Sequence, residues 1–275
     1  MIATPTPWRA TVGGRQRRTP QRLGAGLFLL VVLAFLGLPL LTVVVFSFNT
    51  LPRVSLPLAG LTIHWYEVAF GDPAVRQALI RTAIAAVATA LIAGPFGVAA
   101  ALGLQLISAR ARLTLLTAIQ LPIAMPGLLL AVALAIYYRQ VLGIGFSLWA
   151  AIAGHIMIAL PFVVLVMNAA VANFRFSMLE AARDLGASPL QAFSTVTFPL
   201  IRPAIEGAML LSIAISVDEF IITLFTVGRD TTLPMLIWSR VQRNVDPSIN
   251  ALATVLLVAT TIFALLAARR TTVLL

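Results

Sequence analysis

The sequence predicts an all-α integral membrane protein with six transmembrane helices. Of its 275 residues, 60% are hydrophobic and only 10% are charged, and the mean hydropathy is +1.02. Soluble domains of ordinary composition are far less apolar. Several runs here reach the roughly 18–20 apolar residues that cross a bilayer core. The expected spans are residues 23–48, 77–107, 113–138, 147–172, 204–227 and 249–268.

The composition also excludes several kinds of chemistry. The chain has no Cys, which excludes disulfides, thiolate metal sites and Cys nucleophiles. Its histidines are His64 and His155, which are too few for a His-based metal cluster. It has no Lys, the residue that a phosphate-binding P-loop requires. We therefore expect no cofactor, no metal and no catalytic residue, and any ATP-driven work must come from a partner.

The arginines predict which side of the membrane each loop occupies. The net charge is +10, and all nineteen basic residues are Arg. Basic residues concentrate in cytosolic segments, and twelve arginines lie on the side that holds both termini: Arg9, Arg15, Arg17, Arg18, Arg22, Arg110, Arg112, Arg175, Arg183, Arg202, Arg269 and Arg270. Seven lie on the other side or at its borders: Arg53, Arg76, Arg81, Arg139, Arg229, Arg240 and Arg243. Both termini are therefore expected in the cytosol. Because these arginines flank apolar spans, we expect no nucleic-acid partner.

Residues 1–22 are expected to form a cytosolic N-terminal tail, followed by a membrane domain at 23–275. An N-terminal signal peptide is the alternative, since basic residues precede an apolar run. The run at 23–48 is longer than the apolar region of a signal peptide, and no small-residue cleavage site follows it. We therefore favour an uncleaved first span that enters from the cytosol.

The segments around the second span carry interfacial aromatics and a predicted kink. Thr62–Phe70 contains Trp65 and Tyr66, which favour membrane boundaries, and is expected to form a short surface helix. The second span contains Gly94-Pro95, which predicts a kink because neighbouring helices can satisfy the freed carbonyl.

The third span is expected to be broken in its first half, because it contains Pro122 and Pro126 ahead of Gly127. Irregular backbone at membrane depth occurs only where protein or a water-filled path covers it. The segment is therefore a candidate lining of a translocation pathway. A simple proline kink is an equal alternative.

The fourth span contains His155 and, in mid-helix, Pro161. A neutral, hydrogen-bonded, buried histidine is the simpler interpretation of His155. A gate or a hydrogen-bond donor at a subunit interface is the alternative. After the fifth span, residues 228–248 are expected to form an outer loop, in which 232–242 form a short interfacial or re-entrant helix.

Two adjacent carboxylates, Asp218 and Glu219, lie inside the fifth span. A helix that rises from Ala204 places them about 21 Å along the span. Charged groups at this depth are costly and usually face a water-filled cavity or a partner group. Because adjacent helical residues point about 100° apart, one carboxylate can line a pathway while the other pairs with a neighbour. The alternative is that both form packing pairs, with Arg240 or Arg243 or with a partner chain.

Residues 177–202 interrupt the apolar spans and predict a cytosolic helix–turn–helix. Ser177 and Glu180 form a capping box that starts a first helix, and Gly186 can take the left-handed conformation that ends it. Each helix carries an apolar stripe, formed by Leu179, Ala182 and Leu185 and then by Leu190, Phe193 and Val196. An exposed apolar stripe on such a loop requires a partner surface.

The second short helix of this loop has its own start and stop signals. Ser188 caps it, Pro189 occupies the first turn, where a missing N–H costs nothing, and Gln191 completes a second capping box. Pro199 cannot continue the hydrogen-bond ladder, so the helix is expected to end near Phe198.

The spacing of this loop resembles the EAA loop of ABC importer permeases. The resemblance rests on Glu180-Ala181-Ala182, three residues, Gly186, nine residues, and then Val196-Thr197-Phe198-Pro199. The family has Ile and Leu where this chain has Val196 and Phe198, and both changes keep an apolar side chain. The resemblance implies the type I permease fold, with six transmembrane helices and a cytosolic coupling helix–turn–helix that docks on an ATPase. The residues it assigns to ATPase coupling are Glu180, Ala181, Ala182, Gly186, Leu190, Phe193 and Pro199. An ordinary cytosolic helical hairpin is the alternative.

Shorter pieces resemble a narrower group, the permeases of the spermidine/putrescine class and their relatives for opines and aminoethylphosphonate. The matching segments are Ser216–Phe220, Gly228, Thr232–Pro234, Asn250-Ala251 and His155 with Ala159–Phe162. This resemblance implies polyamine import. A path lined by the carboxylates of Asp218 and Glu219 suits a cationic polyamine electrostatically, and Pro122 and Pro126 are further candidate residues of this pathway. The same permease role in uptake of opines, aminoethylphosphonate or ferric iron is the alternative.

The resemblance also implies partners and a mechanism. The partners are two copies of a cytosolic ATP-binding subunit, a second homologous permease subunit and a periplasmic or lipid-anchored solute-binding protein. The complex lies in the bacterial inner (plasma) membrane, whose lipids contact the permease. The mechanism is alternating access driven by ATP binding, in which the permease does no chemistry.

A secondary transporter or channel without an ATPase is an alternative, but no convincing inverted repeat is present. An intramembrane enzyme is another, but the spans offer no good nucleophile–base pair or metal-ligand set.

Overall fold

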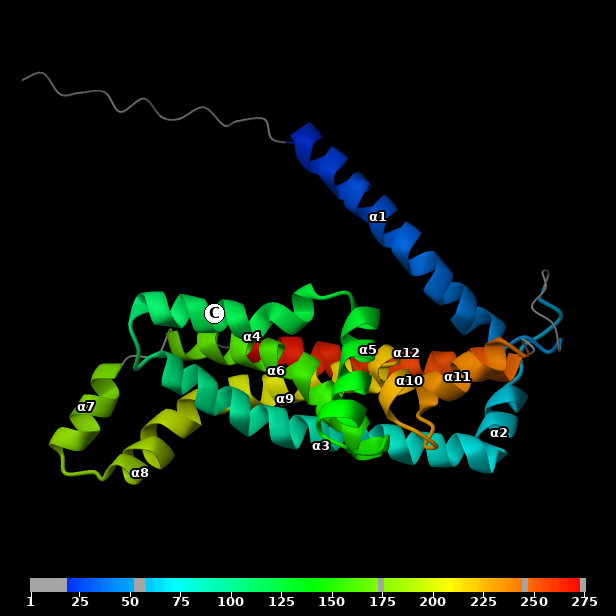
Figure 1. The fold of residues 1–275 in the computed structure, drawn as a ribbon. Coiled ribbons are helices and arrows are strands. Elements are labelled where there is room, and N and C mark those ends of the chain that lie inside the picture. Colours follow the sequence, from blue (N-terminus) through cyan, green and yellow to red (C-terminus); the bar gives the residue numbers. More distant parts are fainter. Residues whose placement is uncertain (1–18, 52–57, 173–175, 244–246, 273–275) are drawn as a thin grey trace, which may run out of the picture. The chain divides into compact units, whose positions relative to one another are not determined.

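The computed structural model describes residues 19–51, 58–172, 176–243 and 247–272, and its secondary structure there is helical apart from one isolated bridge between Asn49 and Leu61 (Figure 1). The chain divides into two units, Met1–Val43 and Val44–Leu275. Five helical stretches of the described residues are long and apolar enough to cross a membrane, and a bent pair of helices supplies a sixth. The six-span all-α fold expected from the sequence is therefore confirmed.

The first unit contains most of α1 (Thr19–Phe46), whose segment Gly24–Phe46 is apolar enough to span a membrane. The helix begins four residues before the expected start at residue 23. Most of the predicted tail, residues 1–18, lies outside the described residues. Pro39 lies inside the helix, and beside it Thr42 Oγ1 donates a hydrogen bond to the Leu38 carbonyl at 2.8 Å.

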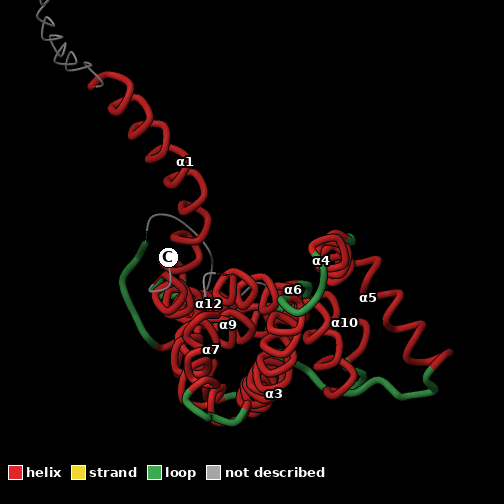
Figure 2. Tube along the Cα trace, turned by 90° about the vertical axis from the view of Figure 1, so that its left-hand side faces the viewer, coloured by secondary structure: helices red, strands yellow, loops and turns green. Residues whose placement is uncertain are grey.

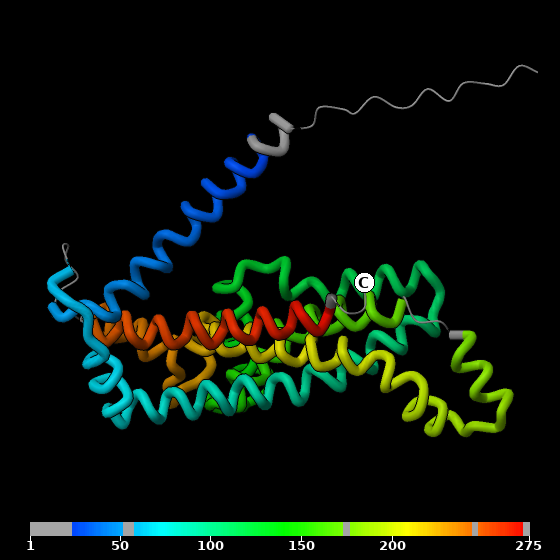
Figure 3. The backbone as a smooth tube through the Cα atoms, turned by 180° about the vertical axis from the view of Figure 1, so that it is seen from behind, coloured from blue at the N-terminus to red at the C-terminus, as the bar shows by residue number. Residues whose placement is uncertain are grey.

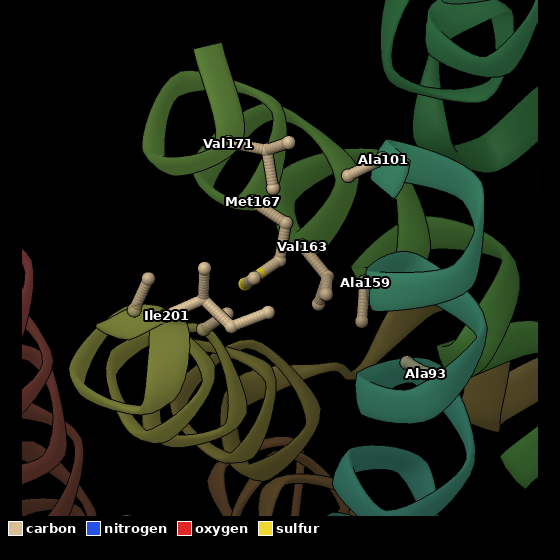
Figure 4. Packing of buried hydrophobic residues seen from close by; sticks show 9 residues of the cluster. Ala93, Ala101, Ala159, Val163, Met167, Val171 and Ile201 are labelled. Carbon is tan, nitrogen blue, oxygen red and sulfur yellow. The ribbon is translucent and has the colours of Figure 1, made fainter. Parts of the chain in front are cut away.

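The core of the second unit is formed by α3 (Pro73–Leu104), α6 (Leu148–Ala172), α9 (Phe198–Asp218) and α12 (Pro247–Thr272), which Figure 2 shows gathered together. Small residues let these helices approach closely. A Cβ on Gly97 of α3 would lie 2.2 Å from Val163 Cγ1 of α6. Figure 4 shows Met167 and Val171 of α6 directed toward Ile201 of α9. This buried cluster contains Ala93, Ala101, Ala159, Val163, Met167, Val171, Ile201, Ala204 and Ala208.

The helices α9 and α12 are also joined by charge. Glu206 of α9 pairs with Arg202 at 2.8 Å and with Arg270 of α12 at 3.4 Å. A Cβ on the next residue, Gly207, would lie 2.8 Å from Thr271 Cγ2. The two helices are therefore in close contact near the last turns of α12.

The third expected span is broken. It consists of α4 (Ala109–Ala124) and the helical stretch 127–141, which contains α5 (Gly127–Ile136) and the π-helix η1 (Tyr137–Val141), bent by 96° at the junction. The break lies at Met125 and Pro126, whose extended backbones separate the helices. Pro122 stays inside α4. The predicted break is confirmed, and Pro126 marks it.

The fifth span differs from the expectation at both ends. An uninterrupted helix was expected at 204–227, but α9 ends at Asp218 and a short α10 (Ile221–Thr226) follows the break. At its other end α9 continues from α8 (Pro189–Ala192) and the π-helix η2 (Phe193–Thr197), so that Pro189–Asp218 is one helical stretch. The expectation that Pro199 ends a helix is therefore wrong. Pro199 lies in the first turn of α9, directly after η2, where the wider π turn changes the hydrogen-bond register.

Two short helices flank the start of α3: α2 (His64–Gly71) and α11 (Leu233–Val241), near the expected positions 62–70 and 232–242. Asp72 caps α3 by accepting from the Ala74 amide at 2.7 Å, and it pairs with Arg240 of α11. The Ala74 hydrogen bond and the Arg240 guanidinium together hold the pKa of Asp72 below its usual value. A second ion pair joins Arg81 to Asp230 at 3.1 Å.

Candidate functional site

The helix–turn–helix expected at 177–202 is present as α7 (Phe176–Asp184), a turn and α8, which project from one end of the bundle (Figures 1 and 3). Gly186 in the turn has φ +89°, in the left-handed region. The Gly186 amide donates to the Arg183 carbonyl at 2.9 Å, and the Ala187 amide donates to the Ala182 carbonyl at 3.1 Å. This pair of bonds is a Schellman motif, which requires the left-handed residue that Gly supplies.

One of the two predicted capping boxes is formed. Ser188 Oγ accepts from the Gln191 amide at 3.3 Å, and Gln191 Oε1 accepts from the Ser188 amide at 2.9 Å. The other expectation was wrong in its position: α7 begins at Phe176, so Ser177 lies inside the first turn and does not precede the helix. The residue that precedes this helix, at position 175, lies outside the described residues.

The tip of the hairpin exposes large apolar side chains. Leu185 is 89% exposed and Leu190 is 76% exposed. Glu180 and Ala181 are exposed as well, while Ala182 and Phe193 are half-buried. An exposed apolar surface that projects from a bundle is typical of a docking site for another protein.

The second half of the hairpin runs without a break into the fifth span. Pro189–Asp218 is a helical stretch of 30 residues, which corresponds to about 45 Å at 1.5 Å per residue. The second half of the hairpin and Asp218 therefore lie at the two ends of one continuous helical stretch.

The carboxylates of Asp218 and Glu219 lie at the break between α9 and α10. Both line an open cavity of about 500 Å³. Glu219 Oε1 accepts a hydrogen bond from the Ile222 amide at 3.0 Å, so this side chain caps α10. Asp218 is exposed, and none of the described residues donates a hydrogen bond to its carboxylate. The lining residues are Phe162, Ala214, Ile215, Asp218, Glu219, Thr260, Thr261 and Ala264.

The alternative pairing of these carboxylates with arginines is wrong within this chain. Arg240 pairs with Asp72, and Arg243 Nε donates to the Ser239 carbonyl at 3.0 Å. Neither arginine is bound to Asp218 or Glu219. The two carboxylates therefore form part of the wall of the cavity, together with apolar side chains and two threonines.

His155 is buried beside the same break, with 1% of its surface exposed. Its Nδ1 lies 2.7 Å from Ser216 Oγ, and its Nε2 lies 2.8 Å from Thr223 Oγ1. The simpler interpretation of this residue, a buried and hydrogen-bonded histidine, is confirmed.

The two broken spans meet. α5 packs against α10, with Ile222 buried among Leu130, Ala131 and Leu134. Gly127, directly after Pro126, has Ile221 Cδ1 3.7 Å from its Cβ position. The structure thus brings the break at Pro126 next to the break that carries the carboxylates. Pro122 and Pro126 are not among the residues that line the cavity.

Sequence reasoning missed three features of this site. The first is the break itself, the second is the pair Thr260-Thr261 in the wall of the cavity, and the third is Phe162. Two consecutive threonines in the middle of an apolar span were the available signal for the second. Of the described residues, no group of three or more His, Asp or Glu is placed to hold a metal ion.

The sequence of this chain is similar to those of a known protein family. Residues 93–274 match the family described as binding-protein-dependent transport system inner membrane component. The spermidine/putrescine transport system permease protein PotC of Escherichia coli strain K12 is 32% identical over 238 residues, which are 86% of this chain and 89% of PotC. The putrescine transport system permease protein PotI of the same strain is 33% identical over 250 residues, which are 87% of this chain and 86% of PotI.

The fold also matches a solved structure. A bacterial alginate ABC transporter, in complex with an alginate pentasaccharide-bound periplasmic protein, has a chain that superimposes with a TM-score of 0.62 and 15% identity. The match covers 94% of the chain described here and 95% of that chain. At this identity the likeness shows a shared fold.

Proposed function

The chain belongs to the family of binding-protein-dependent transport system inner membrane components, the permease subunits of ABC importers, and we propose that its cargo is a polyamine. It is a multi-pass protein of the bacterial inner membrane. The observation that carries the proposal is that Asp218 and Glu219 line one open cavity together with residues of the spanning helices α6 and α12.

The cavity suits a flexible polycation. A polyamine presents ammonium groups separated by methylene chains, so it needs carboxylates for the charges and apolar walls for the chain between them. Asp218 and Glu219 supply the charges, and Phe162 and Ile215 supply apolar surface. Carboxylates in a low-dielectric bundle attract a cation more strongly than they would in water. The relatives PotC and PotI, named for spermidine and putrescine transport, support this choice of cargo.

The hairpin α7–α8 docks on a cytosolic ATP-binding subunit. The apolar side chains of Leu190 and Phe193 enter the partner surface, and the caps of α7 and α8 hold them in place. The full set of residues assigned to this contact is Glu180, Ala181, Ala182, Gly186, Leu190, Phe193 and Pro199. When ATP binding draws two such subunits together, the helical stretch Pro189–Asp218 carries the motion to the break at the cavity. Access to the carboxylates then alternates between the two sides of the membrane.

The proposal extends to the orientation and the partners. Both termini and the hairpin face the cytosol, in agreement with the excess of arginine on that side. Two ATP-binding subunits serve a pair of permeases, of which the second is a homologous chain, and a periplasmic or lipid-anchored solute-binding protein delivers the cargo. The permease itself catalyses no reaction.

The cargo is tested by uptake into proteoliposomes that contain the full complex, loaded with ATP. Labelled spermidine and putrescine are compared with an opine, aminoethylphosphonate and ferric iron, each with its own blank lacking ATP. We expect ATP-dependent uptake of spermidine or putrescine alone. Uptake of another solute in their place would overturn the polyamine assignment and keep the permease role.

A further inference from the structure

The break between α9 and α10 interrupts the backbone ladder inside the bundle, and the freed groups need partners there. Glu219 has an extended backbone (φ −70°, ψ 109°). Its carboxylate accepts from the Ile222 amide at 3.0 Å, and its carbonyl accepts from Thr223 Oγ1 at 2.9 Å. These bonds satisfy the first turn of α10, but they do not attach α10 to the rest of the bundle.

His155 attaches the first turn of α10 to the last turn of α9, because its ring reaches both sides of the break. Ser216, bound to Nδ1, lies in the last turn of α9, and Thr223, bound to Nε2, lies in the first turn of α10. Since the Thr223 hydroxyl donates to the Glu219 carbonyl, its oxygen accepts from Nε2–H. A neutral ring with its proton on Nε2 leaves Nδ1 as an acceptor, and Ser216 Oγ lies 2.7 Å from it.

The surrounding contacts make this bridge part of the packing of four helices. Ser216 Oγ lies 3.4 Å from Thr89 Oγ1, which connects the ring to α3. Gly154, the neighbour of His155 in α6, lies so close to α10 that an added Cβ would be 2.4 Å from Ile222 Cγ2. α10 therefore rests directly on the segment of α6 that carries the histidine.

We propose that His155 is a positioning residue that clamps the α9–α10 break and so holds Asp218 toward the cavity. The ring is buried and is not among the residues that line the cavity, so it acts through Ser216 and Thr223 and does not touch the cargo. The inference goes beyond the proposed function, and it rests on it only in placing Asp218 in the translocation pathway.

The absence of Cys from the chain allows a direct test with single thiols. Thr226→Cys is nearly isosteric and places a thiol at a buried position of α10. Val171→Cys places a matched buried thiol in α6, in the core cluster of α3, α6 and α9. Each is made alone in the parent, in His155→Leu, which removes both ring bonds, and in His155→Gln, whose amide can both donate and accept. The labelling rate with N-ethylmaleimide is read by mass spectrometry of this chain within the full complex.

We expect Thr226→Cys to label slowly in the parent and in His155→Gln, and about tenfold faster in His155→Leu, because α10 opens more often when its buried bonds are lost. Val171→Cys should label slowly in all three. Unchanged labelling of Thr226→Cys in His155→Leu would overturn the clamp. An equal rise for both thiols would overturn it as well, because it would make His155 an ordinary core residue whose loss loosens the whole bundle.

A second variant covers the case in which His155→Leu does not assemble. Thr223→Val is nearly isosteric and removes the bond to Nε2 together with the bond from the Thr223 hydroxyl to the Glu219 carbonyl. It should raise labelling of Thr226→Cys in the same direction; no rise would overturn the proposal. Uptake kinetics supply a further readout, with a KM increased about fivefold in His155→Leu at similar ATP hydrolysis and restored in His155→Gln. Because the thiol assay contains no cargo, it succeeds or fails independently of the polyamine assignment.

Discussion

Asp218 and Glu219 are neighbours in the chain, yet only the Glu219 carboxylate accepts a hydrogen bond from the backbone of the following helix. The Glu219 carboxylate accepts from the Ile222 amide and so caps α10, whereas Asp218 is exposed to the cavity without a donor among the described residues. A carboxylate that the fold does not use and that faces a cavity in a membrane-spanning bundle is available to a ligand. The effects of changing each side chain should therefore differ in kind.

Asp218→Asn should weaken the binding of a polyamine without weakening the fold. Loss of a charged hydrogen bond costs about 1.5–3 kcal/mol, so KM for spermidine uptake should rise by about 10–100-fold. Asp230→Asn is the control. It also removes one aspartate charge, but Asp230 pairs with Arg81 and lies outside the cavity. Parental KM in Asp218→Asn, or an equal rise in Asp230→Asn, would contradict the assignment.

At Glu219, loss of the charge and loss of the helix cap should have different effects on stability. Glu219→Gln keeps an oxygen that can accept from Ile222, whereas Glu219→Ala removes it. We expect Glu219→Ala to be less stable by about 1 kcal/mol, the usual value of a helix cap. Thermal unfolding of the purified complex should then give a lower Tm for Glu219→Ala than for Glu219→Gln. Equal Tm values would remove the capping role.

In the proposed mechanism, the hairpin and the helical stretch Pro189–Asp218 form the element that moves. Gly186 sets the angle between α7 and α8, and Pro189–Asp218 joins α8 to the carboxylates without a break. The π turn Phe193–Thr197 lies between them, where it adjusts the register of the helix ahead of Pro199. Changes at the hairpin should therefore affect coupling and leave the cavity intact.

Gly186→Leu should uncouple transport from ATP hydrolysis. A left-handed backbone costs a residue with a Cβ about 1–2 kcal/mol, so the turn should rearrange while the spans remain folded. We expect uptake to fall at least about tenfold, with normal amounts of protein in the membrane. Gly143→Leu is a matched control, because Gly143 has φ +65° and, like Gly186, no neighbour within 4 Å of its Cβ position. Similar losses in both variants would show backbone strain alone and contradict the coupling role.

Leu190→Glu should prevent docking of the ATP-binding subunit. A buried apolar anchor in an interface contributes about 2 kcal/mol or more, so the amount of subunit that co-purifies should fall at least about tenfold. Leu106→Glu is the control, since Leu106 is 86% exposed and lies outside the hairpin. Full recovery of the subunit with Leu190→Glu would exclude this face of the hairpin from the contact.

The architecture could be predicted from the sequence where the signals are local. The apolar runs predict the spans. Ser188 and Gln191 predict a helix cap, and Gly186 predicts the left-handed turn, and the structure contains both. The proline at position 126 gave the break in the third span. Each of these signals acts on its own neighbours in the chain, so no knowledge of the packing is needed to interpret it.

The rest depends on contacts between distant segments. The break after Asp218 has no Gly or Pro to mark it, and it is held by His155, Ser216 and Thr223 from three helices. Pro199 would end an isolated helix, but a π turn and the packing of Ile201 in the core carry the helix through it. The pairing of Arg240 with Asp72 joins residues that are far apart in sequence, so it could not be read from spacing.

Transport by this chain is proposed to need both the carboxylates of the cavity and ATP hydrolysis by the partner subunit, and one measurement follows the two together. Spermidine uptake and ATP hydrolysis are followed together in proteoliposomes that hold the full complex with its binding protein. The parent is compared with the double variant Asp218→Asn, Glu219→Gln, which keeps the shapes of both side chains. We expect ATP-dependent uptake by the parent and a loss of uptake of at least about tenfold in the double variant, while ATP hydrolysis stimulated by the binding protein persists. Parental uptake by the double variant would show that the carboxylates do not serve transport.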